Sequence, residues 1–133
     1  MSKVICIAGE SGSGKTTSMR NLDPKTTLYI DCDKKGLSWK GWKQQYNTEN
    51  KNYIKTDFVQ QVLIALKKLE TDWKDKKVVV IDTLNGLMIA DEMRRSKEKG
   101  YDKWVDLAAC VWDLVCYAYE LRDDLTVIFT AHT

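Results

Sequence analysis

The chain has 133 residues, of which 44% are hydrophobic and 30% charged, as expected for a globular protein with one core. Its 21 basic and 19 acidic residues give a net charge of +2, which is too balanced to indicate nucleic-acid or membrane binding by charge alone. The sequence shows no signal peptide and no apolar run near the ~18 residues of a transmembrane helix, so we expect one cytoplasmic domain, residues 1–133, without a membrane partner.

Alternating apolar runs and amphipathic segments predict the secondary structure. In chain order, we expect a strand at 3–8, a helix at 16–22, a strand at 27–32, an irregular segment at 33–52, a short edge strand at 52–55, a helix at 56–73, a strand at 77–82, helices at 84–95 and 104–121, and a strand at 125–133. Thr56 or Asp57 is the expected cap of the helix at 56–73.

Apolar strands that alternate with helices imply a mostly parallel sheet with helices on both faces, which is a three-layer α/β fold. Ligands of such sheets bind outside the carboxyl ends of the strands. We therefore look for function at those ends. The four cysteines have no CxxC spacing and lie in apolar runs, so we expect them to be reduced core thiols. They are Cys6, Cys32, Cys110 and Cys116.

The stretch GESGSGKT follows the first predicted strand and opens a helix, and it fits the pattern GxxxxGK[ST] at every fixed position. Glycines let successive backbone N–H groups turn toward phosphate oxygens, and the helix N-terminus adds positive charge. Lys15 is expected to reach the β- and γ-phosphates of ATP, and the Thr16 hydroxyl to bind Mg²⁺. The residues expected to contact the nucleotide are Gly9, Glu10, Ser11, Gly12, Ser13, Gly14, Lys15, Thr16 and Thr17.

Two further strands end in acids. VVVID places Asp82 at a strand tip after four apolar residues, which is the Walker B pattern of a metal-binding aspartate. TLYIDCD places Asp31 and Asp33 at another tip, on the same face by period-2 alternation, with Cys32 opposite. Either acid can face the site, as a general base or as a ligand for an acceptor substrate, or both can be solvated turn residues. We favour Asp33, which is nearer the tip.

The motifs GESGSGKTT, YIDCD, VVVIDTLNGL and VIFTAH stand in the order of the RecA-like P-loop ATPase core. More narrowly, the sequence resembles small phage-encoded RecA-like proteins associated with single-strand annealing and recombination. The resemblance implies ATP and Mg²⁺ as cofactors, single-stranded DNA as a partner, a homo-oligomer, and an ATPase reaction. It assigns catalytic roles to Lys15, to Asp33, where the family has a glutamate, and to His132, where RecA has a γ-phosphate-sensing glutamine. Thr16 and Asp82 take the metal roles.

The resemblance also implies a DNA-binding loop after the sensor strand and further strands beside the phosphate-loop strand. The sequence contains neither, so we expect a truncated or minimal version of the core. Two alternative functions stay open: a small-molecule or nucleoside monophosphate kinase, and a nucleotide-binding assembly module without turnover.

Three other stretches carry competing interpretations. Residues 33–47, DKKGLSWKGWKQQYN, interleave lysines with aromatics, which suits single-stranded nucleic acid, although packed tryptophans under solvated lysines are the simpler explanation. Residues 94–103 are charged and form either a DNA-facing loop or a helix end. Four aromatic residues of the last helix are expected in the core and in a subunit contact: Trp104, Trp112, Tyr117 and Tyr119.

Overall fold

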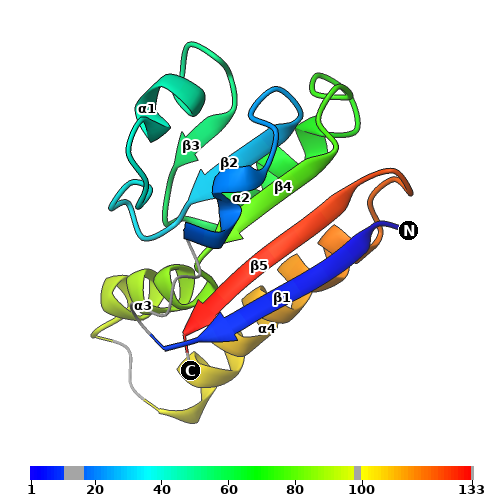
Figure 1. Ribbon diagram of the computed structural model, residues 1–133. Helices are drawn as coiled ribbons and strands as arrows, with labels where there is room; N and C mark the ends of the chain where they lie inside the picture. Colours follow the sequence, from blue (N-terminus) through cyan, green and yellow to red (C-terminus); the bar gives the residue numbers. More distant parts are fainter. Residues whose placement is uncertain (11–16, 98–99, 133) are drawn as a thin grey trace.

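The computed structural model describes residues 1–10, 17–97 and 100–132 and contains a five-stranded parallel sheet (Figure 1). The strand order is β1-β5-β4-β2-β3, so the last strand of the chain lies between the first and the fourth. The strands are β1 (Lys3–Gly9), β2 (Thr27–Asp31), β3 (Tyr53–Lys55), β4 (Val78–Asp82) and β5 (Thr126–His132). All five strands predicted from the sequence are present, and the sheet has the α/β architecture that the alternation predicts.

One 3₁₀-helix and four α-helices connect the strands. They are η1 (Thr17–Asn21), α1 (Trp42–Gln45), α2 (Val59–Lys68), α3 (Leu84–Arg94) and α4 (Tyr101–Tyr119). None of them is long and apolar enough, over the part of the chain that is described, to cross a bilayer.

The helix α2 is shorter at both ends than the predicted helix at 56–73, and neither expected residue caps it. Its N-cap is Phe58, which makes no side-chain capping bond. Asp57 instead forms ion pairs with Lys34, at 3.0 Å, and with Arg94. Because its carboxylate is engaged in these long-range ion pairs, Asp57 does not cap the helix. The amphipathic pattern in the sequence therefore begins before the first helical residue, Val59.

The two faces of the sheet are built differently. The first face is covered by α2, α3 and α4 and is wholly apolar, because alternate residues of the three central strands point into it. Those residues are Leu28, Ile30, Val79, Ile81, Val127 and Phe129. The second face carries a smaller cluster, in which Tyr29, Val80 and Ile128 pack against Met19 of η1 and against Leu37 and Tyr46 of the segment between β2 and β3. Each such side chain contributes about 1.5–3 kcal/mol when fully buried.

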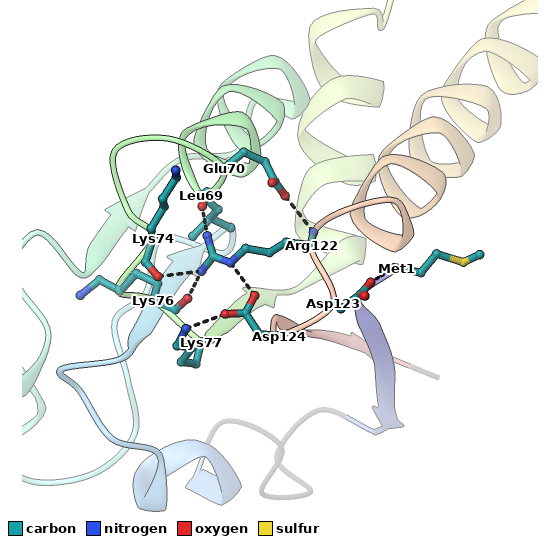
Figure 2. Close-up of polar contacts among 9 residues, drawn as sticks. All are labelled: Met1, Leu69, Glu70, Lys74, Lys76, Lys77, Arg122, Asp123 and Asp124. Atoms are coloured by element: carbon teal, nitrogen blue, oxygen red, sulfur yellow. Dashed lines mark hydrogen bonds and ion pairs between the residues drawn. The ribbon is translucent and has the colours of Figure 1, made fainter.

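Arg122 organises the end of the sheet opposite the strand tips (Figure 2). Its guanidinium donates to the carbonyl oxygens of Leu69, Lys74 and Lys76, and its Nε donates to Asp124 at 2.9 Å. Five N–H donors in a planar fork suit Arg for this binding of several carbonyl groups. These bonds fold residues 69–76 into turns, which explains why α2 ends at Lys68 and not at residue 73. They also engage this arginine far from the predicted site.

The prediction that all four cysteines are core thiols is wrong. Only Cys32 is buried, Cys110 is partly buried, and Cys6 and Cys116 are exposed. Cys6 lies on β1, which is an edge strand paired only with β5, and Cys116 lies on an exposed part of α4. All four thiols are free, as the absence of CxxC spacing predicts.

The reaction rates of the four thiols test their burial in this fold. Burial raises the pKa of the Cys32 thiol, and the nearby carboxylates of Asp33, Asp31 and Asp82 raise it further. A raised pKa and burial both slow reaction, because the thiolate is the nucleophile. With a chromogenic disulfide reagent at pH 8, we expect Cys6 and Cys116 to react quickly and Cys32 only after unfolding. Modification of Cys32 in the folded protein at the rate of Cys6 would contradict this fold.

Candidate functional site

The carboxyl ends of the five parallel strands lie along one edge of the sheet (Figure 1). The predicted site residues lie at the ends of β1, β2, β4 and β5. Gly9, which starts the phosphate-loop motif, lies opposite His132 in the β1–β5 ladder. Asp31 lies opposite Asp82 in the β2–β4 ladder. Neighbouring strands are about 4.8 Å apart, so β5 separates the phosphate-loop strand from the Asp82 strand by roughly 10 Å. The last strand therefore has the position between these two strands that its sensor assignment requires.

The phosphate-loop motif follows β1 and precedes η1, a 3₁₀-helix of five residues in place of the helix expected at 16–22. Gly9 ends β1, and Thr17 begins η1. The predictions for Ser11, Gly12, Ser13, Gly14, Lys15 and Thr16 fall on residues 11–16, which lie outside the described residues. The predicted roles of these residues, and of the His132 side chain, stay predictions.

The Asp82 carboxylate is held by two hydroxyl groups from neighbouring strands. Tyr29 of β2 donates to Oδ2 at 2.5 Å, and Thr130 of β5 donates to Oδ1 at 2.6 Å. Asp82 is only 2% exposed, and a buried carboxylate needs such donors to compensate for its lost hydration. The two bonds therefore fix the orientation of this carboxylate and tie three strands together at their tips.

A hard divalent cation fits this carboxylate chemically. Mg²⁺ prefers oxygen ligands, keeps several waters, and is usually bound through one or two carboxylates plus substrate phosphates. Each carboxylate oxygen of Asp82 receives one hydroxyl donor in the contacts described above, and the carboxylate is the kind of oxygen ligand that Mg²⁺ prefers. No group of three or more His, Cys, Asp or Glu residues forms a metal site within the described ranges.

Asp33 lies beside Asp82 and contacts the start of α3. The Thr83 hydroxyl donates to Asp33 Oδ1 at 2.9 Å and accepts from the Gly86 N–H at 3.0 Å, which makes Thr83 the N-cap of α3. The Lys35 Nζ lies 3.7 Å from Asp33 Oδ2. A Cβ added at Gly86 would come within 2.3 Å of Asp33 Oδ1, so only glycine admits this close approach. The backbone of α3 therefore positions the Asp33 carboxylate.

Asp31 has a different environment, although it shares the strand tip with Asp33. Its carboxylate accepts from the backbone N–H of Lys34 at 2.9 Å, from that of Gly36 at 2.8 Å, and from the Tyr53 hydroxyl at 2.6 Å. It is 1% exposed. These bonds hold the turn that follows β2 and use the acceptor capacity of the carboxylate. Asp31 therefore has a structural role in this turn, and the role of Asp33 as the acid that acts on a substrate stays a prediction.

Four residues of the site were not predicted from the sequence: Tyr29, Thr83, Gly86 and Thr130. Tyr29 and Thr130 are polar-tipped residues within apolar strands, two positions from Asp31 and from His132. Period-2 alternation places each of them on the same face of its strand as the candidate site residue two positions later, and this is the signal that identifies them. Thr83 was recognisable as a cap, because it directly precedes an apolar-periodic segment.

The Lys-Trp stretch packs onto the second face of the sheet. Tyr46 is buried against Tyr29, with ring centroids 5.6 Å apart, and Trp39 and Trp42 are partly buried. The lysines of the stretch are exposed. The tryptophans therefore pack the segment down, as the simpler interpretation expects, while each keeps part of its surface exposed.

The aromatic residues of α4 divide between core and surface. Tyr117 packs against the first cluster, whereas Trp112 is 69% and Tyr119 48% exposed. Trp112 and Tyr119 thus lie outside the core, and the subunit contact expected for the aromatic residues off the apolar side stays a prediction.

Comparison with known proteins shows the family to which the chain belongs and a solved structure with a similar fold. The sequence profile of a family described as "AAA domain" matches residues 1–133. Among solved structures, the fold resembles a KaiC-like protein from the hyperthermophilic archaeon Pyrococcus horikoshii, with a TM-score of 0.56 and 15% identity. That match covers 98% of this chain and 61% of the archaeal protein. A search of curated protein sequences found no significant match.

The Thr130 hydroxyl tests the account of Asp82. We expect Thr130→Val to lower the free energy of unfolding by about 1–3 kcal/mol, because it removes a hydroxyl donor from a buried carboxylate. The matched control is Thr126→Val, on the same strand and partly buried. Urea unfolding measures both changes. Equal losses in the two variants would show that the Asp82 contact contributes nothing.

Proposed function

Because the chain belongs to the AAA-domain family of P-loop ATPases, we propose that it binds ATP on residues 9–17 and hydrolyses it at the adjoining strand tips. The observation that carries this proposal is the convergence of Gly9, Asp82 and Asp33 at one edge of a parallel sheet. Such an edge is where open α/β sheets bind their ligands.

Each residue has a role that its chemistry suits. Backbone N–H groups of the loop and the Lys15 ammonium bind the phosphates, and Thr16 and Asp82 hold Mg²⁺. The bound metal supplies charge neutralisation at the phosphates. Asp33 accepts a proton from the attacking water and orients it toward the γ-phosphate. His132, opposite Gly9, donates a hydrogen bond to that phosphate and reports its presence.

The DNA role is the finer part of the proposal. The motif order of the RecA-like core supports a function in phage DNA recombination or single-strand annealing, with single-stranded DNA as the partner. RecA-like sites commonly lie between subunits, so we expect a homo-oligomer. The exposed Trp112 and Tyr119 on α4 support a subunit contact, because large apolar side chains that gather on a surface mark interaction sites.

The kinase alternative would require several arginines that are available to close over the nucleotide. Arg94 pairs with Asp57, Arg95 lies 3.0 Å from Asp106, and Arg122 binds carbonyl groups at the opposite end of the sheet. These contacts argue against an arginine-rich lid over the nucleotide. The fourth arginine, Arg20, is exposed on η1, directly after the predicted phosphate loop.

Lys15 tests nucleotide binding. We expect Lys15→Ala to abolish ATP binding, because the phosphate charge loses its principal cation. Titration with a fluorescent ATP analogue measures the affinity, and Lys3→Ala is the control because Lys3 is exposed at the far end of β1. Unchanged ATP binding by Lys15→Ala would refute the assignment.

Matched substitutions of Asp33 and Asp31 distinguish a role in ATP hydrolysis from a role in folding stability. We expect Asp33→Asn to bind ATP normally and to hydrolyse it about 10²–10⁴-fold more slowly, as for loss of a general base. We expect Asp31→Asn to lower the free energy of unfolding by about 1–3 kcal/mol, because its carboxylate holds the turn. Equal hydrolysis by Asp33→Asn and the unmodified protein would exclude Asp33 as the base.

The hydrolysis assay also separates the alternative functions when it includes nucleoside monophosphates and single-stranded DNA. Transfer of phosphate to a nucleotide acceptor would identify a kinase. Saturable ATP binding without hydrolysis, with and without DNA, would identify an assembly module. Release of inorganic phosphate is the outcome that our proposal predicts.

A further inference from the structure

A hollow of about 500 Å³ lies within the segment between β2 and β3, on the second face of the sheet. It is lined by residues 37–44, which include two tryptophans and two lysines. Two glycines shape it: Gly36 and Gly41 have φ of +81° and +85°, in the left-handed region that other residues rarely adopt. A Cβ on Gly36 would lie 2.8 Å from the Trp42 ring, so the backbone there directly supports the indole.

The two indoles are held in defined orientations while they line the hollow. Trp39 packs edge-on against Tyr46 and donates from Nε1 to Gln45 Oε1 at 2.8 Å. The ring of Trp42 packs at 5.4 Å from that of Tyr53. Both tryptophans are only partly buried, so each keeps some surface toward solvent. Rings that are already ordered lose little entropy when a flat ligand stacks on them.

The charge around the hollow has one sign. No acidic residue occurs between positions 34 and 48. Lys34 and Lys35 face the acids Asp57 and Asp33, whereas Lys40 and Lys43 make no ion pair with any part of the chain that the structure describes. The Lys43 Nζ lies 5.8 Å from the centre of the Trp42 ring, so the positive charge and the aromatic surface are adjacent.

We propose that the hollow formed by residues 37–44 binds single-stranded nucleic acid, with bases stacked on Trp39 and Trp42 and phosphates bound by Lys40 and Lys43. Aromatic platforms beside unpaired cations suit this ligand, because every base has a stackable face and every nucleotide a negative charge. An acidic polypeptide would use the lysines but would leave the two indoles without a partner. The inference rests on the proposed DNA role, to which it gives a location.

The hollow connects to the candidate catalytic acid through a short path. Tyr53 packs against Trp42 and donates its hydroxyl to Asp31, which in turn binds the N–H groups of Lys34 and Gly36. Asp33 lies between Asp31 and Lys34 in the chain. Nucleic acid in the hollow therefore contacts the same segment that begins with Asp33, and we expect it to alter the rate of ATP hydrolysis.

The test compares two charge reversals of equal size. Lys40→Glu with Lys43→Glu changes the hollow, and Lys67→Glu with Lys74→Glu changes exposed lysines in and beyond α2, which covers the other face of the sheet. Fluorescence anisotropy with a labelled oligothymidylate of about 20 nucleotides measures the affinity, and thermal melting confirms that both variants fold. We expect the first pair to weaken binding at least about 10-fold and the control pair less than about 3-fold.

Two further readouts identify the ligand class. The slope of log affinity against log salt concentration should fall by about 1.4 in the Lys40→Glu, Lys43→Glu variant, because two phosphate contacts are lost at about 0.7 each. An abasic oligomer with the same charge should bind the unmodified protein at least about 10-fold more weakly, because stacking is lost. Equal binding of the abasic oligomer, or tighter binding of polyglutamate, would overturn the inference.

Failure of the inference and failure of the proposed function give different results. Equal affinity in the two charge-reversal variants, with clear binding by the unmodified protein, would overturn the hollow as the site and leave the DNA role intact. An unmodified protein that binds ATP but no oligonucleotide would overturn both the inference and the DNA role. Loss of ATP binding in Lys15→Ala tests the nucleotide site independently of either result.

Discussion

A buried carboxylate sets the geometry of this molecule. Asp82 lies at the tip of the central strand β4 and receives hydroxyl donors from Tyr29 on β2 and Thr130 on β5. Burial of a charged group without partners costs several kcal/mol, so the fold has to bring both hydroxyl groups to this point. This requirement aligns three strand tips, and the alignment places Gly9, His132 and Asp33 around the same edge. The hydrogen bonds that stabilise buried Asp82 therefore also bring the candidate site residues together.

The two faces of the sheet have different roles: the first contains the larger apolar core, and the second carries the polar groups of the candidate site. The first face is covered by three helices and is apolar throughout, and the Arg122 contacts with residues 69–76 close its far end. The second face carries the polar groups: Asp82, Tyr29, Thr130 and Asp31. It is covered by η1 and by a segment rich in glycine, lysine and tryptophan instead of long helices. Residues that can bind ligands are therefore concentrated where the covering layer is thinnest.

The strands, their parallel arrangement and the meeting of the acidic tips could be predicted from the sequence, because each depends on a local pattern. Period-2 apolar runs mark the strands, and the phosphate-loop motif sets the expected topology. The contacts of Asp82 could not be predicted, because Tyr29 and Thr130 lie 53 and 48 residues away and meet it only through the strand order. The same reason applies to Gly86. Any larger residue there would clash with the carboxylate of Asp33, which lies on another segment of the chain.

The errors also have physical causes. Cys6 lies in an apolar run that predicts a buried strand, but that strand is at the edge of the sheet and paired on one side only. The end of α2 is decided by Arg122, which lies more than fifty residues later. In each case a tertiary contact, or its absence, outweighs the local pattern.

The most direct test of the account is a crystal structure of the protein with Mg²⁺ and a non-hydrolysable ATP analogue. The account predicts that the phosphates lie between the loop after Gly9 and the tips of β4 and β5, with the metal toward Asp82 and the γ-phosphate within reach of His132 and of a water beside Asp33. A nucleotide bound elsewhere, or phosphates directed away from Asp82, would contradict it.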